Sequence, residues 1–179
     1  MKYSLYVTDT ETTGLNYEHD VIELSIIRLS DDVQKTWFLK PANQDSIDAG
    51  ALRINGHVLE DLLWKTKSGK EKYRDPSSVI VEVENWLAED DLPTQNRILV
   101  GQNISFDKSM LENLWRRAKS FDTFPFGRRM IDTAQIEFLI DYLEDDFKEN
   151  YSLSGLIKKY NIKNAKAHSA DADSFATKQ

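Results

Sequence analysis

Apolar residues recur at two different spacings along the chain, and the change between the two spacings outlines the secondary structure. In the first forty residues, short alternating or β-branched runs separated by turn residues predict three antiparallel strands. Further along, apolar residues recur every three to four positions, which is typical of amphipathic helices, and one short apolar run between them predicts another strand. The expected strands are Ser4–Thr8, Val21–Leu29, Val33–Leu39 and Ile98–Val100.

Helices are expected after the third strand and throughout the second half of the chain. The triplet Asp75-Pro76-Ser77 is a helix-start signal, whereas the polar, basic stretch Lys65–Arg74 before it is interpreted as a solvated loop. Strands first, and then strands alternating with helices, predict an α/β fold with a mixed sheet covered by helices. The expected helices are a short one at Asp48–Arg53, one carrying Val79, Val83, Trp86 and Leu87, one carrying Phe106, Met110, Leu111, Leu114 and Trp115, and three at Thr133–Leu143, Leu153–Tyr160 and Ala170–Lys178.

Composition narrows the class of protein further. The 179 residues contain no internal repeat or long Gly/Pro linker, so we expect a single domain over residues 1–179. The sequence has no cysteine, which excludes disulfides and thiolate chemistry and leaves carboxylates and three histidines for metal binding or acid–base work. Neither a long apolar segment nor a signal peptide can be drawn, so a cytoplasmic location without membrane contact is expected.

The net charge of −7 bears on the class of partner. A chain this acidic is not expected to grip long nucleic acid non-specifically through a basic face. It remains compatible with a site that holds only a few terminal nucleotides, because bound divalent cations offset the charge of an acidic site.

The first candidate for chemistry is the segment Val7–Leu15, where Asp9 and Glu11 follow an apolar run. Alternation along an extended chain places these two acids on the same side. Two carboxylates held so close suit a hard cation such as Mg²⁺ or Mn²⁺, with several threonine hydroxyls and a turn at Gly14 nearby. The Asp-x-Glu pattern alone is equally compatible with solvated acids at an exposed strand end.

Two further segments place acids at comparable positions. In GQNISFD, Asp107 falls in the first turn of a predicted helix, where simple capping is the alternative, and Asn103 is a natural turn residue. In HSADAD, His168 precedes a predicted helix that carries Asp173, although a surface histidine and an acidic cap would also fit. Together, four carboxylates and one histidine from three segments are what a two-metal phosphodiesterase site requires.

These three segments resemble the motifs of the DEDDh family, the 3′–5′ exonucleases related to the proofreading subunit of bacterial replicative polymerases. TDTETTGL resembles the first motif, the Asn-x-x-Phe-Asp core of GQNISFD the second, and the His-x-Ala-x-x-Asp of HSADAD the third. The resemblance runs from about Tyr3 to Thr177. It implies a ribonuclease H-like mixed sheet of about five strands, three antiparallel and then parallel, flanked by helices.

The resemblance also implies roles for individual residues. Asp9 is expected to bridge two divalent cations, Mg²⁺ or Mn²⁺, with Glu11 and Asp173 completing the first metal site and Asp107 holding the second. His168 is expected to act as the general base. The residues expected to contact the terminal nucleotide are Thr10, Thr12, Thr13, Gly14, Leu15, Asn55, His57, Asn103 and Phe106.

The implied activity is metal-dependent 3′–5′ exonuclease activity that releases nucleoside 5′-monophosphates from a single-stranded 3′ terminus, with DNA favoured. An exonuclease for RNA 3′ ends or short oligoribonucleotides, and a catalytically silent nucleic-acid-binding module, remain the alternatives. A polymerase or another replication or repair protein is the partner that the resemblance suggests. The chain departs from the family pattern in three places. Asp171 is an additional acid, which we expect to face solvent, and the final helix is short, as is typical of a shortened or excised domain. The basic stretch Lys65–Arg74 is long, and the alternative to a solvated loop is an arm that contacts the substrate.

Overall fold

The chain folds around one five-stranded sheet. In the computed structural model, which describes residues 3–118, 124–147, 150–163 and 168–179, the strand order is β3-β2-β1-β4-β5. β1 pairs antiparallel with β2 and β2 with β3, whereas β4 and β5 run parallel to β1. This arrangement confirms the predicted mixed sheet. The strands are β1 (Ser4–Thr12), β2 (Val21–Arg28), β3 (Val33–Phe38), β4 (Arg97–Gly101) and β5 (Met130–Asp132).

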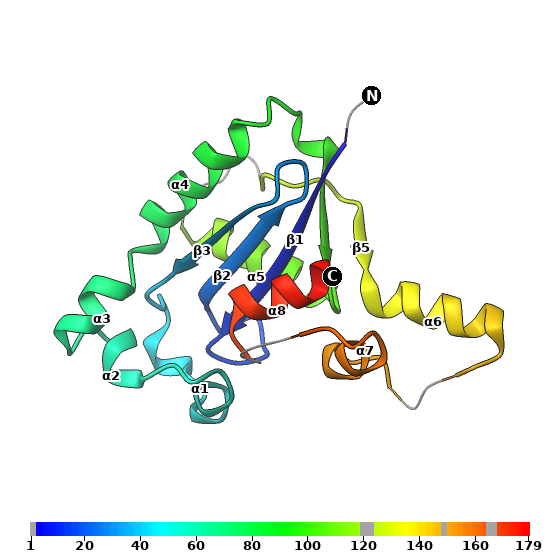
Figure 1. The fold of residues 1–179 in the computed structure, drawn as a ribbon. Coiled ribbons are helices and arrows are strands. Elements are labelled where there is room, and N and C mark those ends of the chain that lie inside the picture. Colours follow the sequence, from blue (N-terminus) through cyan, green and yellow to red (C-terminus); the bar gives the residue numbers. More distant parts are fainter. Residues whose placement is uncertain (1–2, 119–123, 148–149, 164–167) are drawn as a thin grey trace.

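Helices surround the sheet on both faces and at one edge, as Figure 1 shows. Asp75 caps α4 by accepting from the backbone N–H of Ser77 at 2.9 Å, and Pro76 occupies the first turn, as the start signal predicted. The helices are α1 (Ala49–Asn55), α2 (Leu59–Leu62), α3 (Lys67–Lys72), α4 (Pro76–Ala88), α5 (Ile104–Arg117), α6 (Thr133–Glu144), α7 (Leu153–Lys159) and α8 (Ala170–Lys178), with short 3₁₀ turns η1 (Gln44–Ser46) and η2 (Thr94–Asn96).

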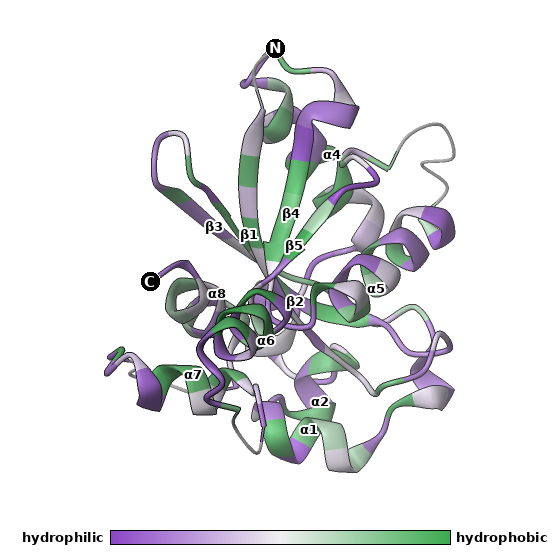
Figure 2. Cartoon of the chain, turned by 90° about the vertical axis from the view of Figure 1, so that its right-hand side faces the viewer, coloured by the Kyte–Doolittle hydropathy of each residue, from purple (hydrophilic) through white to green (hydrophobic). Residues whose placement is uncertain are grey.

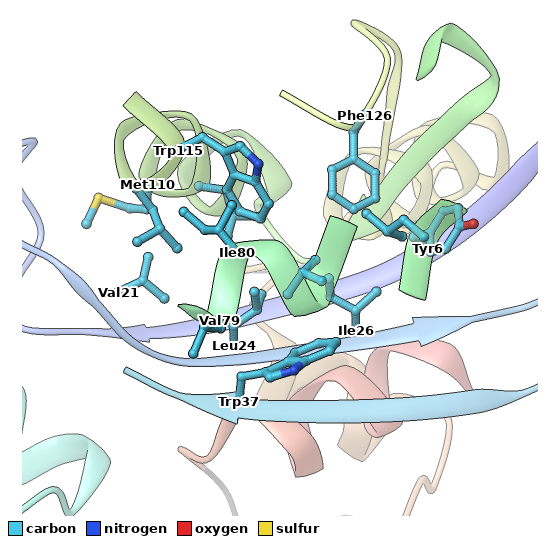
Figure 3. Packing of buried hydrophobic residues seen from close by; sticks show 14 of the residues in the cluster. Tyr6, Val21, Leu24, Ile26, Trp37, Val79, Ile80, Met110, Trp115 and Phe126 are labelled. Carbon is cyan, nitrogen blue, oxygen red and sulfur yellow. The ribbon is translucent and has the colours of Figure 1, made fainter. Parts of the chain in front are cut away.

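The main hydrophobic core lies between the sheet and helices α4 and α5. Trp37 from β3, Ile80 from α4 and Trp115 from α5 are all buried there, and Figure 3 shows them in the same cluster as Tyr6 and Phe126. The predicted apolar stripes of α4 and α5 therefore face the sheet, and burial of these side chains contributes most of the free energy that holds this layer.

The opposite face of the sheet is covered by α8. The hydroxyl oxygens of Ser25 on β2 and Ser174 on α8 lie 2.9 Å apart, and Gln34 on β3 donates to the backbone carbonyl of Asp171 at 2.7 Å. Residues of β1 alternate between the two faces, because Tyr6 belongs to the α4–α5 core while Val7 packs on the other side. β1 thus carries one set of side chains toward α5 and the other toward α8.

Two local predictions differ from the structure. β1 continues to Thr12 instead of stopping near Thr8, so Asp9 and Glu11 lie inside the strand. The basic stretch is exposed at its lysines, as expected, but it contains the helix α3, which Thr66 caps through the backbone N–H of Gly69 at 2.9 Å. A side chain at Gly69 would stand 2.3 Å from the backbone oxygen of Asp61, so glycine permits this close packing.

Candidate active site

The carboxyl end of β1 brings the first two candidate ligands to the face that α8 covers. Asp9 pairs in register with Ser25 and Glu11 with Glu23, so both acids follow the alternation that turns Val7 toward that face. Ligand oxygens of Asp9, Glu11 and Asp173 lie within 4.8 Å of one another. Asp9 and Asp173 therefore belong to one cluster although they are 164 positions apart in the chain.

The start of α8 fixes the third acid. Asp173 sits in the first turn and is 9% exposed, and its Oδ2 accepts from the backbone N–H of His168 at 3.0 Å. His168 has a left-handed backbone with φ of 62°, and its side chain is exposed. Asp171 in the same turn is exposed, as expected, and accepts from the Ser169 hydroxyl at 2.7 Å.

Asp107 approaches β1 from the other face of the sheet. The Thr10 hydroxyl, which turns toward α5, donates to Oδ1 of Asp107 at 2.7 Å. Asp107 is 4% exposed and lies in the first turn of α5, just after Asn103 adopts a left-handed φ of 55°. Thr10 therefore ties the second motif to the strand position between Asp9 and Glu11.

The electrostatics of the cluster favour a cation. Burial raises the pKa of Asp9 well above its usual range, and the negative charges of Asp107 and Glu11 raise it further. Burial, followed by the charges of Glu23 and Asp173, raises the pKa of Glu11 to about 7. Burial also raises the pKa of Asp107 to about 7, against the hydrogen bond from Thr10, which lowers it. Carboxylates that ionise this reluctantly are stabilised when a divalent cation neutralises them.

The residues expected at the terminal nucleotide lie around this cluster in different environments. The hydroxyl of Thr12 donates to the carbonyl of Gly14 at 2.7 Å, and that of Thr13 accepts from the backbone N–H of Asp20 at 2.9 Å. Leu15 is 81% exposed. Asn103 is also exposed, and Phe106 is half-buried against the core.

The polar side chains of the turn after α1 form hydrogen bonds with other residues of the protein. Asn55 donates to the backbone carbonyl of Thr12 at 3.1 Å, and its side chain also bonds Glu11, which lowers the pKa of that carboxyl. His57 is 7% exposed, with Nε2 at 3.0 Å from Oε2 of Glu23 and Nδ1 at 2.6 Å from the Tyr73 hydroxyl. A neutral imidazole that donates to Glu23 through Nε2 accepts from Tyr73 at Nδ1.

Of the residues around the cluster, Tyr73 was not singled out from the sequence, whereas Glu23 and Asp132 belong to Ile22-Glu23-Leu24 and Ile131-Asp132-Thr133, two further segments that resemble the family. Glu23 is an acid in a strand whose eight residues are all buried. Asp132 caps α6 and also accepts from the backbone N–H of Asn103 at 3.1 Å. Tyr73 carried no signal of its own, because its partner His57 lies sixteen positions away across two short helices.

A cavity of about 730 Å³ lies between α6, α7 and α8, and none of the four candidate carboxylates lines it. Its wall includes Ile136, Ile140 and Phe175, and Figure 2 shows the hydrophobic residues along α6. Glu137 in this wall is bonded by Lys159 and by the Tyr160 hydroxyl. Within the described part of the chain, a group of three or more acids or histidines close enough to hold a metal occurs only at the β1–α8 cluster, which is therefore the candidate site.

Comparison with known proteins identifies the family of the chain. The RNase_T exonuclease family model matches residues 6–179, and the chain belongs to this exonuclease family. Two similar proteins are the PolC-type DNA polymerases III of Lacticaseibacillus paracasei and Bacillus subtilis, each 28% identical over 96% of this chain. The chain spans 10% and 11% of the lengths of these two proteins.

Solved structures show the same fold. A zinc-bound complex of E. coli exonuclease I with single-stranded DNA aligns with a TM-score of 0.75 at 18% identity, covering 99% of this chain and 39% of that one. Cell-death related nuclease 4 aligns with a TM-score of 0.75 at 15% identity, covering 98% of this chain and 61% of that one. The chain is thus an exonuclease-type enzyme domain with a ribonuclease H-like sheet, and no helix among its described residues is long and apolar enough to cross a membrane.

Proposed function

We propose that this chain is a metal-dependent 3′–5′ exonuclease that removes terminal nucleotides from single-stranded DNA as nucleoside 5′-monophosphates. The observation that carries the proposal is the meeting of Asp9, Glu11 and Asp173 within 4.8 Å, with Asp107 joined to the same strand through Thr10. Carboxylates held this close repel one another unless a cation or a proton neutralises them, and a divalent cation can do so for several at once. Residues 1–179 are proposed to act as one exonuclease domain, which the family match over 6–179 supports.

The donor set fits Mg²⁺ or Mn²⁺. All four candidate ligands are carboxylates, three of them gather within ligating distance, and burial raises the pKa of Asp9, Glu11 and Asp107. Asp9, Glu11 and Asp173 are proposed to hold one cation, and Asp9 and Asp107 a second. Divalent cations bound there supply Lewis-acid stabilisation of the charge that develops on the phosphate oxygens.

The chain's own residues then supply orientation and proton transfer. His168 is proposed to accept a proton from the attacking water as its oxygen bonds to phosphorus and the bond from phosphorus to the 3′ oxygen breaks. The proton returns through solvent to the departing 3′ oxygen, leaving a shortened strand with a 3′ hydroxyl and a free 5′-monophosphate. The exposed imidazole of His168 and the fixed main chain beside Asp173 suit this role.

The preference for DNA rests on the relatives. The PolC-type proteins are DNA polymerases by name, and the exonuclease I structure is a complex with single-stranded DNA. The same relatives favour a polymerase or another replication protein as the functional partner.

The test is degradation of matched DNA and RNA oligonucleotides, single-stranded and duplex, each labelled at its 5′ end, with Mg²⁺ or Mn²⁺. Stepwise shortening from the 3′ end with release of 5′-monophosphates is expected, fastest for single-stranded DNA. Asp173→Asn should abolish it, whereas Asp171→Asn, a change of an exposed acid in the same helical turn, should not. Faster RNA degradation would overturn the DNA preference, and binding without cleavage would make the chain a silent binding module.

A further inference from the structure

The two most exposed large hydrophobic side chains of the described residues lie two positions apart, immediately after the first motif. Leu15 is 81% exposed and Tyr17 is 76% exposed. Both belong to the loop that joins β1 to β2, residues 13–20, which is called the β1–β2 loop below. When a flat apolar partner covers an aromatic ring held in water, the contact is favourable in free energy.

Hydrogen bonds within the β1–β2 loop fix its conformation. The backbone N–H of Thr13 donates to the carbonyl of Asp20 at 2.9 Å, and that of His19 donates to the carbonyl of Asn16 at 3.0 Å. The backbone N–H of Asn16 also donates to Nδ1 of His19 at 3.0 Å. A side chain at Gly14 would stand 2.3 Å from Nε2 of His19, so the loop closes tightly over this glycine.

Helix α5 fixes the backbone of Tyr17 in particular. Its carbonyl oxygen accepts from Nδ2 of Asn113 at 2.6 Å and from Nη2 of Arg117 at 2.7 Å. Arg117 also forms an ion pair with Asp20 at 2.6 Å. The main chain of Tyr17 is therefore positioned by two α5 side chains while its ring stays in solvent, so covering the ring costs the rotamer freedom of one side chain and little backbone entropy.

The position of the loop relates it to the carboxylates. Thr12, the last residue of β1, follows directly on Glu11, and Thr12 pairs with Val21 at the far end of the loop. Figure 1 shows the loop beyond the arrowhead of β1, at the same end of the sheet as the start of α8. When the terminal phosphodiester of a nucleic acid lies at the carboxylates, the β1–β2 loop is therefore within a few nucleotides of the bond that is cleaved.

We propose that Tyr17 is a stacking platform for an unpaired base that precedes the terminal nucleotide, an inference that rests on the proposed exonuclease function. Every base offers a flat π-face, so stacking on one aromatic ring tolerates any sequence. Bases of a duplex are already stacked and paired, so Tyr17 can stack only on nucleic acids whose 3′ segment is single-stranded. Tyr17 therefore contributes to selection of single-stranded ends, separately from the carboxylates that carry the chemistry.

The test compares Tyr17→Ala, Tyr17→Phe and the control Tyr142→Ala, which removes another exposed tyrosine, 61% exposed, from α6. Substrates are a single-stranded oligonucleotide and the p-nitrophenyl ester of thymidine 5′-monophosphate, which has no preceding base. Tyr17→Ala is expected to raise KM for the oligonucleotide by roughly 5- to 150-fold, with kcat near the wild-type value and the ester unaffected. Tyr17→Phe and Tyr142→Ala are expected to match the wild type.

The outcomes distinguish a failure of the stacking proposal from a failure of the proposed exonuclease function. An unchanged oligonucleotide KM in Tyr17→Ala overturns the platform and leaves the exonuclease function intact. An equal loss on the ester also overturns it, because Tyr17 would then act through the site itself. If the wild-type protein cleaves neither substrate, the proposed function fails. An oligonucleotide carrying 2-aminopurine next to its terminal nucleotide supplies a readout apart from turnover, since Tyr17→Ala should abolish the fluorescence quenching by stacking.

Discussion

The backbone N–H of His168 donates to Oδ2 of Asp173 with a nitrogen-to-oxygen distance of 3.0 Å. The third-motif histidine is therefore joined to the third-motif acid through its main chain, and the imidazole takes no part in the bond. The bond also orients a carboxylate that lies within 4.8 Å of the ligand oxygens of Asp9 and Glu11. Removing the imidazole should consequently leave the acid cluster in place.

His168→Ala is expected to keep Mn²⁺ affinity close to that of the wild type, because oxygen-rich sites for such cations rarely use imidazole. It should lower the single-turnover cleavage rate by roughly 10²–10⁴, the usual contribution of a positioned general base. Asp9→Ala should lose Mn²⁺ binding and cleavage together. Calorimetric titration beside single-turnover kinetics checks both, and Mn²⁺ binding as weak in His168→Ala as in Asp9→Ala would show that the imidazole is a ligand.

Metal removal should make the stability of the protein depend on pH. Burial holds the pKa of Glu11 and that of Asp107 at about 7 in the folded chain, above the ordinary values of 4.5 and 3.8. The folded state then binds more protons than the unfolded state between those ordinary values and about pH 7, so the free energy of unfolding falls as pH rises through this window. In EDTA, Tm at pH 8 should lie on the order of 5–10 °C below Tm at pH 5.

Mg²⁺ or Mn²⁺ should restore the Tm lost at pH 8 and have less effect at pH 5, where protons already occupy Glu11 and Asp107. Glu11→Gln, which removes one of the two groups, should reduce the dependence on pH in EDTA, whereas Asp171→Asn, on the surface, should leave it as in the wild type. A wild-type Tm in EDTA that rises between pH 5 and pH 8 would contradict the electrostatic account of this site.

The elements with strong local patterns were predictable, and so were the motifs that they carry. The apolar run of Val21–Arg28 and the stripe of α5 each contain enough residues to reveal their period, and Asp9 and Glu11 lie on one side of β1 as alternation requires. β5 escaped a pattern-based prediction because three residues cannot display a period. α3 escaped because its polar sequence has no apolar stripe, although Tyr73 at its end is 1% exposed.

The residues around the candidate site were less predictable than the candidate ligands. Glu23, His57 and Tyr73 meet from β2, from the turn after α1 and from the end of α3, so their contact depends on tertiary packing and not on local spacing. The expected contact of His57 with the terminal base stays a prediction. Both ring nitrogens of His57 have hydrogen-bond partners inside the protein, which supports a second interpretation, that His57 stabilises the fold. The two interpretations can be tested against each other.

His57→Ala is expected to lower the free energy of unfolding by about 2–4 kcal/mol, because it leaves the buried Glu23 carboxylate and Tyr73 hydroxyl without their shared partner. Tyr73→Phe removes only one of these hydrogen bonds and should cost about 1 kcal/mol. Urea unfolding measures both. A stable His57→Ala protein with a raised KM for oligonucleotides would favour the base-contact interpretation and count against the internal network.

Ca²⁺ in place of Mg²⁺ is expected to support oligonucleotide binding but to suppress cleavage. The larger ion takes more ligands at longer distances, which loosens the alignment that a two-metal displacement requires. Fluorescence anisotropy of a labelled strand, followed by analysis of the products, measures binding and cleavage in the same samples. Turnover in Ca²⁺ equal to that in Mg²⁺ would contradict the two-metal interpretation.

Asp132 offers a last test of how the second motif is positioned. Its Oδ1 accepts from the backbone N–H of Asn103 at 3.1 Å and from that of Ala134 at 3.0 Å, so one carboxylate oxygen caps α6 and also holds the turn that starts α5. Asp107 lies in the first turn of α5, and its place therefore depends on that turn. Asp132→Ala should cost about 1–3 kcal/mol of unfolding free energy and weaken Mn²⁺ binding by roughly 10–100-fold. Asp132→Asn retains an acceptor oxygen and should retain most of both quantities. Calorimetry with Mn²⁺ on the two variants decides the matter: wild-type affinity in Asp132→Ala would mean that the Asn103 turn holds Asp107 without this carboxylate, and an equal loss in Asp132→Asn would assign the effect to the charge of Asp132 instead of its hydrogen bonds.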